Sequence, residues 1–271
     1  MVFGDIPLRC KAPQIVFVQN SHLIRPSNFS WSIGGLKLAI FRLIFRLNIN
    51  FAQVFIVQTE VMLEGLTSSY PSIAGKIRVI SQPPPSWILD SVANLESHNG
   101  MTGKKLKLIY PAAGYPHKNH KLLEKISSRS DLDWPIENLK LTISPDNHPN
   151  QNLLWIECSG LLSEAQIIDA YSKVDALLFL STHESYGIPL IEAMFLGIPI
   201  VCPNLPYAKA LCLCEAIYFE PNSVDSLNQA ILTLHSRLTS GWRPNWRLAL
   251  TKIPKSWELV AEEMAGVIRG V

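Results

Sequence analysis

The 271-residue sequence lacks several features that would decide its class at once. No uncharged apolar run reaches the roughly 18–20 residues that cross a bilayer, and the start (MVFGDIPLRC) has no basic stretch followed by an apolar one. We therefore expect no membrane span and no signal peptide. The five cysteines form no CxxC pair, which argues against a disulfide framework or a zinc ribbon and favours a reducing compartment. These absences predict a globular cytoplasmic protein.

Charge is also scarce, at 17% of residues, while 48% are hydrophobic, so the chain can build a packed core. The few charges are unevenly placed. Residues 1–89 hold eight basic and three acidic residues (net +5), whereas the remainder holds 16 basic and 19 acidic residues (net −3). This asymmetry predicts two modules, with the first one facing an anionic partner. Phospholipid headgroups fit better than nucleic acid, because no aromatic-rich basic groove accompanies the charge.

The hydrophobic pattern predicts an α/β fold. Short apolar runs expected as strands alternate with helix-length segments, which is typical of βαβ units and of parallel sheets covered on both faces. The expected strands are 14–19, 53–58, 76–80, 106–111, 139–144, 153–157, 175–180 and 198–202. The expected helices are 33–47, 118–128, 164–171, 188–196 and 223–237.

Three consecutive prolines in the segment Gln82–Ser86 interrupt this pattern, since proline continues neither a helix nor a central strand. We therefore expect a partial first lobe over 1–85, a linker over 86–103 and a complete second lobe over 104–250. The last segment, 251–271, is expected to form a helix that packs back toward the first lobe. Two such lobes would bind ligands at the carboxyl ends of their strands.

The most informative segment is STHESYGIPLIEAMFLGIPI at residues 181–200. It predicts a buried strand, a polar loop turned by Gly187, and a helix with Pro189 in its first turn. The free amides and the dipole of a helix start suit an anion. Glu184 in the loop and Glu192 inside the helix supply carboxylates for sugar hydroxyls. A lone glutamate here could equally be a helix cap or a solvated residue.

The whole string, however, resembles the donor-binding signature of the retaining glycosyltransferases of family 4 (group 1, the two-Rossmann-domain or GT-B architecture). The family pattern E-[GS]-[FY]-G-x-P-x-x-E-A-M-x-x-G-x-P-[VI] is matched from Glu184 to Ile200. The resemblance implies two Rossmann-like lobes, the first incomplete and the second a parallel-sheet donor-binding domain. It assigns donor binding to Glu184, Ser185, Tyr186, Gly187, Ile188 and Glu192.

Two upstream segments extend the resemblance. YPAAGYPHKNH at 110–120 looks like the family's strand-to-helix loop, whose lysine grips the donor diphosphate. This implies that Lys118 and Gly114 bind the donor, and that Lys118 and Glu184 are catalytic. Many members carry an arginine where Ala112 or Ala113 stands here. CSGLLSE at 158–164 resembles the stretch whose main chain at Leu161 meets the nucleobase, although Ser163 and Gln166 also read as an ordinary capping box.

The resemblance implies a glycosyltransferase that moves a sugar from a nucleotide diphosphate sugar to a hydroxyl acceptor, a glycan or a lipid-linked saccharide, with retention and without a metal or other cofactor. The alternative is a non-catalytic nucleotide-sugar-binding protein, or one half of a two-chain transferase. Dehydrogenase and kinase chemistry is disfavoured because neither GxGxxG nor a Walker lysine loop is present. We expect no nucleic-acid partner.

The first lobe is short for this architecture, so we expect one of three explanations: a second copy or another chain completes it, the reading frame is truncated, or the chain is a donor-binding remnant. Three strands and one apolar helix over 33–47 would leave apolar surface uncovered, because Ile40, Phe41, Ile44 and Phe45 occupy more than one face of that helix. Arg42 and Arg46 add a basic stripe. This pattern predicts self-association or peripheral contact with an anionic membrane on the cytoplasmic side.

Overall fold

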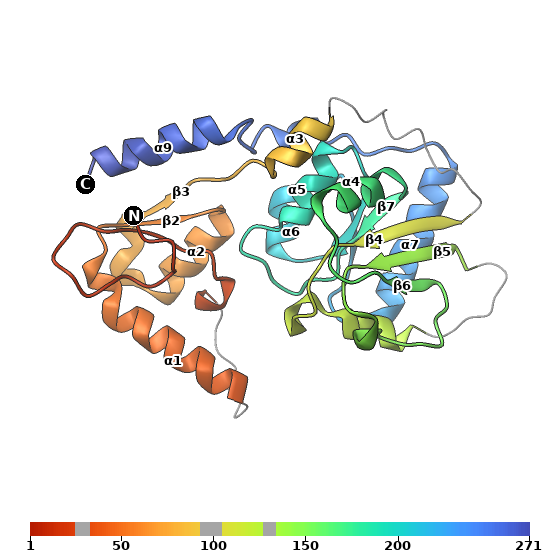
Figure 1. The fold of residues 1–271 in the computed structure, drawn as a ribbon, viewed down its shortest axis with the longest axis horizontal. Helices are drawn as coiled ribbons and strands as arrows, with labels where there is room; N and C mark the ends of the chain where they lie inside the picture. Colours follow the sequence, from red (N-terminus) through yellow and green to blue (C-terminus); the bar gives the residue numbers. More distant parts are fainter. Residues whose placement is uncertain (25–32, 93–104, 127–133) are drawn as a thin grey trace. The chain divides into compact units, whose positions relative to one another are not determined.

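The structure is a computed structural model of all 271 residues, and it describes residues 1–24, 33–92, 105–126 and 134–271. The chain divides into two compact units (Figure 1). Unit 1 comprises Met1–Pro83, Glu184–Tyr186 and Lys252–Val271, and unit 2 comprises Pro84–His183 and Gly187–Thr251. Within the described residues, no helix combines the length and the apolar character that a membrane crossing requires.

Unit 1 is built on a three-stranded parallel sheet in the order β1-β2-β3. The strands are β1 (Ile15–Phe17), β2 (Val54–Val57) and β3 (Ile77–Val79). The helices are α1 (Ile33–Asn48), α2 (Glu60–Ser69) and α9 (Trp257–Arg269). Short 3-10 turns lie at Ser21–Leu23, Ile49–Phe51 and Pro71–Lys76.

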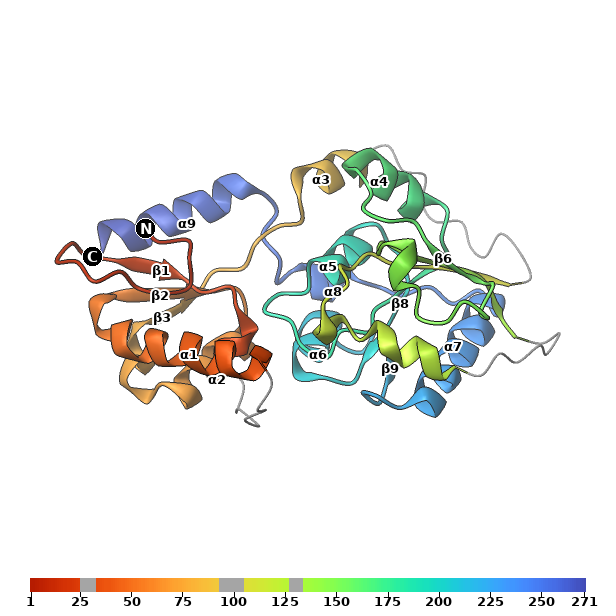
Figure 2. The ribbon, with the colours of Figure 1, turned by 60° about the horizontal axis from the view of Figure 1, so that its bottom comes forward.

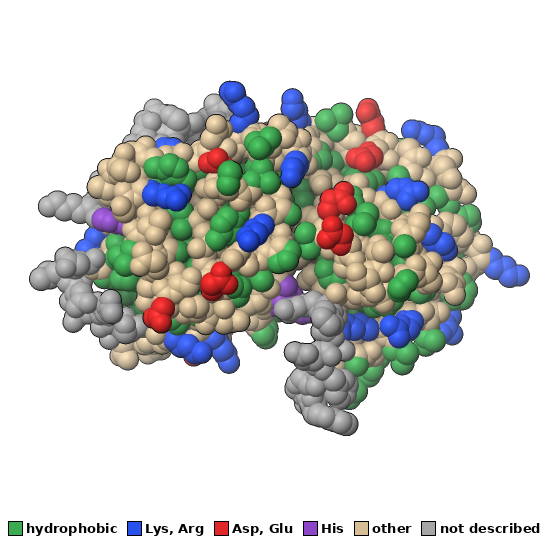
Figure 3. Space-filling view, turned by 180° about the vertical axis from the view of Figure 1, so that it is seen from behind, with side chains coloured by type: hydrophobic (Ala, Val, Ile, Leu, Met, Phe, Trp, Pro, Cys, Tyr) green, Lys and Arg blue, Asp and Glu red, His purple; other side chains and the backbone are tan. Residues whose placement is uncertain are grey.

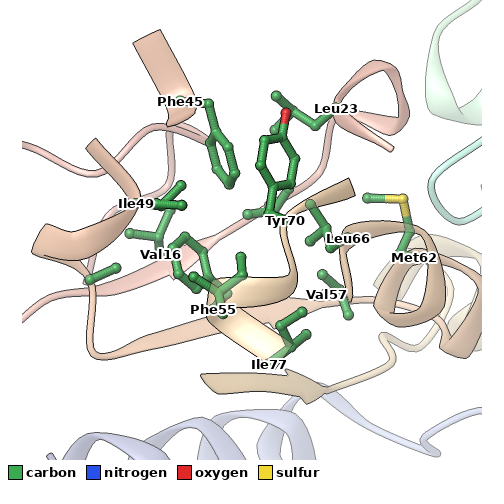
Figure 4. Packing of buried hydrophobic residues seen from close by; sticks show 13 residues of the cluster. Val16, Leu23, Phe45, Ile49, Phe55, Val57, Met62, Leu66, Tyr70 and Ile77 are labelled. Carbon is green, nitrogen blue, oxygen red and sulfur yellow. The ribbon is translucent and has the colours of Figure 1, made fainter. Parts of the chain in front are cut away.

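The unit 1 sheet is covered on both faces by the chain itself. Helices α1 and α2 lie on one face and α9 on the other (Figure 2). On the first face, Phe45 of α1 and Leu66 of α2 pack against Phe55 of β2, all fully buried (Figure 4). On the other face, Val260 of α9 packs against Phe17 and Ile56. The sheet itself is therefore covered on both faces, because α2, which was not expected from the sequence, joins α1 on one face and α9 covers the other.

Unit 2 contains a six-stranded, all-parallel sheet in the order β6-β5-β4-β7-β8-β9. Its strands are β4 (Leu106–Tyr110), β5 (Ile136–Leu141), β6 (Ile156–Cys158), β7 (Ala176–Leu178), β8 (Ile200–Pro203) and β9 (Ile217–Phe219). The chain runs outward from β4 to β6 and then returns to place β7 on the other side of β4. The strand order thus reverses between β4 and β7, which is where open α/β sheets bind ligands.

Of the described helices of unit 2, three connect successive strands as parallel crossovers, one precedes the first strand and two follow the last strand. They are α3 (Ser86–Val92), α4 (Glu164–Ser172), α5 (Ile188–Phe195), α6 (Pro206–Cys212), α7 (Val224–Thr239) and α8 (Arg247–Leu250). Helix α3 packs beside α4 and α5, while α7 lies against β8 and β9. The 3-10 turns of this unit are η4 (Pro116–Lys118), η5 (His120–Lys125) and η6 (Pro145–Asn147).

Two local expectations differ from the structure. Residues 86–92, expected as part of the linker, form α3, and residues 93–103 of that linker lie outside the described residues. The expected helix over 118–128 is instead split into η4 and η5, because Asn119 takes the left-handed conformation at φ 58°. An α-helix cannot continue through such a residue, which an asparagine tolerates better than most.

The surface drawn in Figure 3 shows hydrophobic side chains scattered among polar ones, with basic and acidic side chains interspersed. Single exposed apolar residues of this kind are ordinary on a folded protein and mark no site.

Candidate functional site

The candidate site lies in unit 2 at the carboxyl ends of β4 and β7, the two strands between which the sheet order reverses. The loop after β4 carries Gly114 and Lys118, and the loop after β7 leads through Glu184 to Gly187. These loops are joined by main-chain contacts. The carbonyl oxygen of His117 accepts hydrogen bonds from Thr182 N (2.8 Å), Thr182 Oγ1 (3.2 Å) and Ser181 Oγ (3.2 Å). The fold therefore brings the two motif segments of unit 2 together.

Lys118 is half-buried and ends the turn η4 rather than starting a helix. Its carbonyl oxygen accepts a hydrogen bond from Tyr110 Oη at 2.8 Å, which ties the loop to β4. Its Nζ lies 6.0 Å from the ring centroid of Phe179, at the outer range of a cation–π contact. A lysine at the end of a turn meets no opposing dipole.

The positive charge of Lys118 also affects its neighbour His120. Burial, with a smaller contribution from the positive charge of Lys118, lowers the pKa of His120 to about 4. The His120 ring lies 5.0 Å from the ring of buried Tyr110. His120 is thus neutral at physiological pH and packs behind the loop. The cationic side chains of this short segment are then Lys118 and the exposed Lys121.

Gly187 forms the N-cap of α5 in the left-handed conformation, at φ 88°. Pro189 occupies the first turn of that helix, so the amides at Gly187 and Ile188 lead the helix without a capping side chain. A helix start of this kind presents main-chain donors and the positive end of a dipole. This geometry fits the predicted anion site, and the assignment of Gly187 and Ile188 to a donor stays a prediction.

A substitution at Gly187 tests how strictly this turn is required. A Cβ there would lie 3.3 Å from both Leu190 Cδ1 and Leu211 Cδ1, whereas a Cβ on Gly197, at φ 71°, meets nothing within 4 Å. We expect Gly187→Ala to lower the free energy of unfolding by about 1–2 kcal/mol through left-handed strain plus crowding. Gly197→Ala, with strain alone, should lose less. If denaturant unfolding shows the same loss of stability for both variants, the contact of a Cβ at position 187 with Leu190 and Leu211 contributes nothing.

Glu192 lies inside α5 and is 7% exposed. Its Oε2 accepts a hydrogen bond from Tyr171 Oη on α4 at 2.8 Å. Burial raises the pKa of Glu192 to about 6, although the Tyr171 bond lowers it in part. The solvated-surface alternative for Glu192 is therefore wrong. The Tyr171 bond joins α5 to the helix that follows the Leu161 segment.

The raised pKa makes a prediction about stability. Between about pH 4.5 and 6 the unfolded chain ionises Glu192 while the folded chain keeps it protonated, so rising pH favours the unfolded state. A shift from 4.5 to about 6 corresponds to roughly 2 kcal/mol. We expect the wild type to lose about this much stability relative to Glu192→Gln on going from pH 4 to pH 7. If the difference in the free energy of unfolding between wild type and Glu192→Gln is the same at pH 4 and pH 7, the pKa of Glu192 is not raised by burial.

The segment around Leu161 combines both interpretations made from its sequence. Gly160 turns the chain at φ 71°, and the side chain of Leu161 is 95% exposed. Ser163 caps α4 in a capping box, with Ser163 N donating to Gln166 Oε1 at 2.9 Å. The capping box is thus confirmed. The contact of the Leu161 main chain with a nucleobase stays a prediction.

Glu184, Ser185 and Tyr186 group with unit 1 rather than with unit 2. Thr59 Oγ1 donates to the carbonyl oxygen of Ser185 at 3.2 Å. The hydroxyl of Tyr186 accepts from Gln82 N at 2.9 Å and donates to the carbonyl oxygen of Gln82. Tyr186 as a whole is 3% exposed, so its side chain is not open to a ligand. The donor-binding roles of these three residues stay predictions.

Two features of the site were not found from the sequence. Tyr171 holds Glu192, and the carbonyl oxygen of His117 joins the two loops. Tyr171 follows Ile167 by four residues, so both lie on the same side of α4, and this spacing could have indicated that the Tyr171 side chain points into the protein. Nothing in the sequence indicates a main-chain acceptor such as the His117 carbonyl.

Comparison with known proteins supports the fold and the family. The chain is 28% identical over 89 residues to O-antigen chain mannosyltransferase B of Escherichia coli, covering 33% of this chain and 23% of that protein. It is 24% identical over 248 residues to O-antigen chain mannosyltransferase RfbU of Salmonella typhimurium, covering 84% of this chain and 65% of that one. The chain therefore spans less than two thirds of the length of either relative.

Among solved structures, the Anabaena protein Alr3699/HepE in complex with UDP and glucose superposes with a TM-score of 0.62 at 15% identity, over 96% of this chain and 72% of that one. This likeness confirms the expected α/β fold with parallel sheets of GT-B type. The family model of the glycosyl transferases of group 1 matches residues 93–237, which is more than half of the chain. The match spans β4 to α7 and so includes both joined loops. The chain belongs to the group 1 glycosyl transferases.

Proposed function

We propose that the protein is a glycosyltransferase that binds a nucleotide diphosphate sugar at the β4–β7 edge of unit 2 and transfers its sugar to a hydroxyl acceptor. The single observation that carries this proposal is the joining of the Lys118 loop to the loop before α5, at the point where the strand order reverses. A cation and a row of free amides at this point suit a diphosphate.

Each part of the donor has a candidate partner in this arrangement. Lys118 and the amides of Gly187 and Ile188 hold the diphosphate, with Gly114 letting the loop approach it. The main chain at Leu161 meets the base, and Glu192 accepts from ribose hydroxyls. Glu184 orients the sugar, with Ser185 and Tyr186 lining the same loop. The bond between the anomeric carbon and the diphosphate oxygen breaks, a bond from the acceptor oxygen to that carbon forms, and the acceptor's proton leaves with the released nucleoside diphosphate.

Stabilising the negative charge on the leaving diphosphate is then the largest catalytic contribution, and Lys118 supplies it together with the helix amides. We propose that this charge is balanced by the protein without a metal and that the anomeric configuration is retained. Undiminished transfer in EDTA and a product of unchanged anomeric configuration by NMR would support these two points. Loss of transfer in EDTA would contradict the first, and an inverted product the second.

The relatives named as mannosyltransferases make mannose the first sugar to test, and the solved Anabaena complex makes UDP the first alternative carrier. We propose a glycan or lipid-linked saccharide as acceptor, and a peripheral place on the cytoplasmic membrane face. Calorimetric titration with GDP-mannose and UDP-glucose, followed by transfer assays with the donor that binds, tests the proposal. Donor binding without transfer to any saccharide acceptor would favour the alternative of a binding protein or half of a two-chain enzyme.

A further inference from the structure

Helix α1 presents an apolar stripe to solvent. Its members are spaced at helical intervals along one side of the helix, and each is between 41% and 57% exposed. We call them the α1 stripe: Leu36, Ile40, Leu43, Ile44 and Leu47. An apolar patch gathered on one side of a helix differs from scattered exposed residues and marks an interaction surface.

The α1 stripe is not needed for the core of unit 1. The opposite side of the helix supplies the core through Phe45, which is fully buried against Phe55 and Tyr70 with ring centroids 5.7 and 4.8 Å away (Figure 4). Phe41 packs partly against the same cluster. Helix α1 is therefore apolar on two sides, and only one of them faces the sheet.

The charges on helix α1 itself all have one sign. Helix α1 contains three basic residues and no acidic residue, and the sequence has no acid between Asp5 and Glu60. Exposed Lys37 and Arg46 lie on opposite flanks of the stripe, given the helical period. Arg42 is anchored, because its Nε and Nη2 donate to the carbonyl oxygen of His22 at 2.8 and 2.6 Å.

The apolar stripe and its basic flanks together indicate which partner fits this surface, a second copy of the chain or a lipid bilayer. A second copy that packs through the same stripe would offer apolar residues but would bring Lys37 and Arg46 against the same cations, with no acid on either helix to pair them. An anionic bilayer offers both hydrocarbon and negative headgroups. At 16 residues, α1 is about 24 Å long, too short to cross the roughly 30 Å hydrocarbon core. It can lie in the plane of the interface.

We propose that the α1 stripe is a membrane-docking surface that inserts into the headgroup boundary of an anionic phospholipid bilayer, with Lys37 and Arg46 contacting the headgroups. The proposal deepens the peripheral location proposed above, where a lipid-linked acceptor would be reached. The docking itself depends only on unit 1, so it can hold even if the donor chemistry proposed for unit 2 does not.

The test is sedimentation of the whole protein with vesicles of phosphatidylcholine alone and with vesicles of phosphatidylcholine mixed with phosphatidylglycerol, at low and high salt. We expect binding to the mixed vesicles only, falling as salt rises. Leu43→Ser with Leu47→Ser should weaken partitioning at least tenfold, because the two variants remove apolar side chains that leave water on insertion. Lys37→Gln and Arg46→Gln should each weaken it about fivefold, from about 1 kcal/mol per basic residue.

Matched controls come from outside the stripe. Leu248 is 65% exposed and Lys252 is exposed, so Leu248→Ser and Lys252→Gln remove the same chemistry elsewhere and should leave partitioning unchanged. Circular dichroism and thermal melting verify that all variants fold. A wild type that stays in solution with mixed vesicles at low salt overturns the proposal. So does equal binding by stripe and control variants, or a dimer that Leu43→Ser dissociates and that ignores vesicles.

Nucleotide titration of the same proteins separates this proposal from the proposed function. The stripe variants should bind nucleotide diphosphates like the wild type. Vesicle binding by a wild type that binds no nucleotide would leave membrane docking intact and remove the donor site.

Discussion

Replacing Lys118 with alanine is expected to reduce the rate of sugar transfer by about 10²–10³-fold, the usual effect of removing one group that stabilises charge developing in the transition state. The reason is the place of Lys118 at the end of the β4 loop, joined to the loop before α5 through His117. Ala112 and Ala113, earlier on the same loop, are uncharged, so they offer no second cation to compensate for the loss of Lys118.

Lys121→Ala is the matched control, because Lys121 is exposed and lies three residues further along the same segment. It should leave transfer within about twofold, as expected for a screened surface charge. The comparison is made in a steady-state transfer assay at fixed ionic strength. Similar losses for both variants would contradict a diphosphate contact by Lys118 and would point to the general positive field of the segment.

The second large effect is expected at Glu192. Glu192→Ala should weaken nucleoside diphosphate binding about 10–150-fold, because a hydrogen bond to a charged group contributes about 1.5–3 kcal/mol. Tyr171 would also lose the acceptor for its buried hydroxyl. Since burial raises the pKa of Glu192 to about 6, wild-type affinity should fall as pH drops below 6 and the carboxylate becomes protonated.

Tyr171→Phe provides the control for Glu192, because it removes the same hydrogen bond but leaves the carboxylate in place. Calorimetric titration should show a much smaller loss for Tyr171→Phe than for Glu192→Ala. If the two variants lose affinity equally, Glu192 acts by holding α4 and α5 together, and its contact with the ribose is contradicted. Unchanged affinity in Glu192→Ala would remove it from the site altogether.

Much of the fold could be predicted from hydrophobic patterning. Buried strands such as β7 and β8 are short apolar runs bounded by polar or glycine residues, and a parallel sheet requires that pattern. Helix α2 was not predicted, because it has acidic residues among its apolar ones, and only the tertiary structure shows which side is buried. The break at Asn119 depends on a single left-handed residue, which no periodicity reveals.

The candidate site was predicted where a motif fixes local geometry. Gly187 and Pro189 define the turn and the start of α5 in the sequence itself, and the structure has both. The burial of Glu192 was not predictable to the same degree, because it depends on Tyr171 from a helix twenty residues earlier. The exposed side of α1 followed from helical spacing alone, since two apolar sides cannot both face one sheet.

One measurement tests the proposed function most directly: calorimetric titration of the wild type and of Lys118→Ala with a nucleoside diphosphate and with the matching monophosphate. A donor site at the β4–β7 edge predicts that the wild type binds the diphosphate more tightly than the monophosphate. It also predicts that Lys118→Ala loses most of this difference while Lys121→Ala keeps it. A wild type that binds neither nucleotide, or that binds both equally and is unaffected by Lys118→Ala, would contradict the assignment of this edge as the donor site.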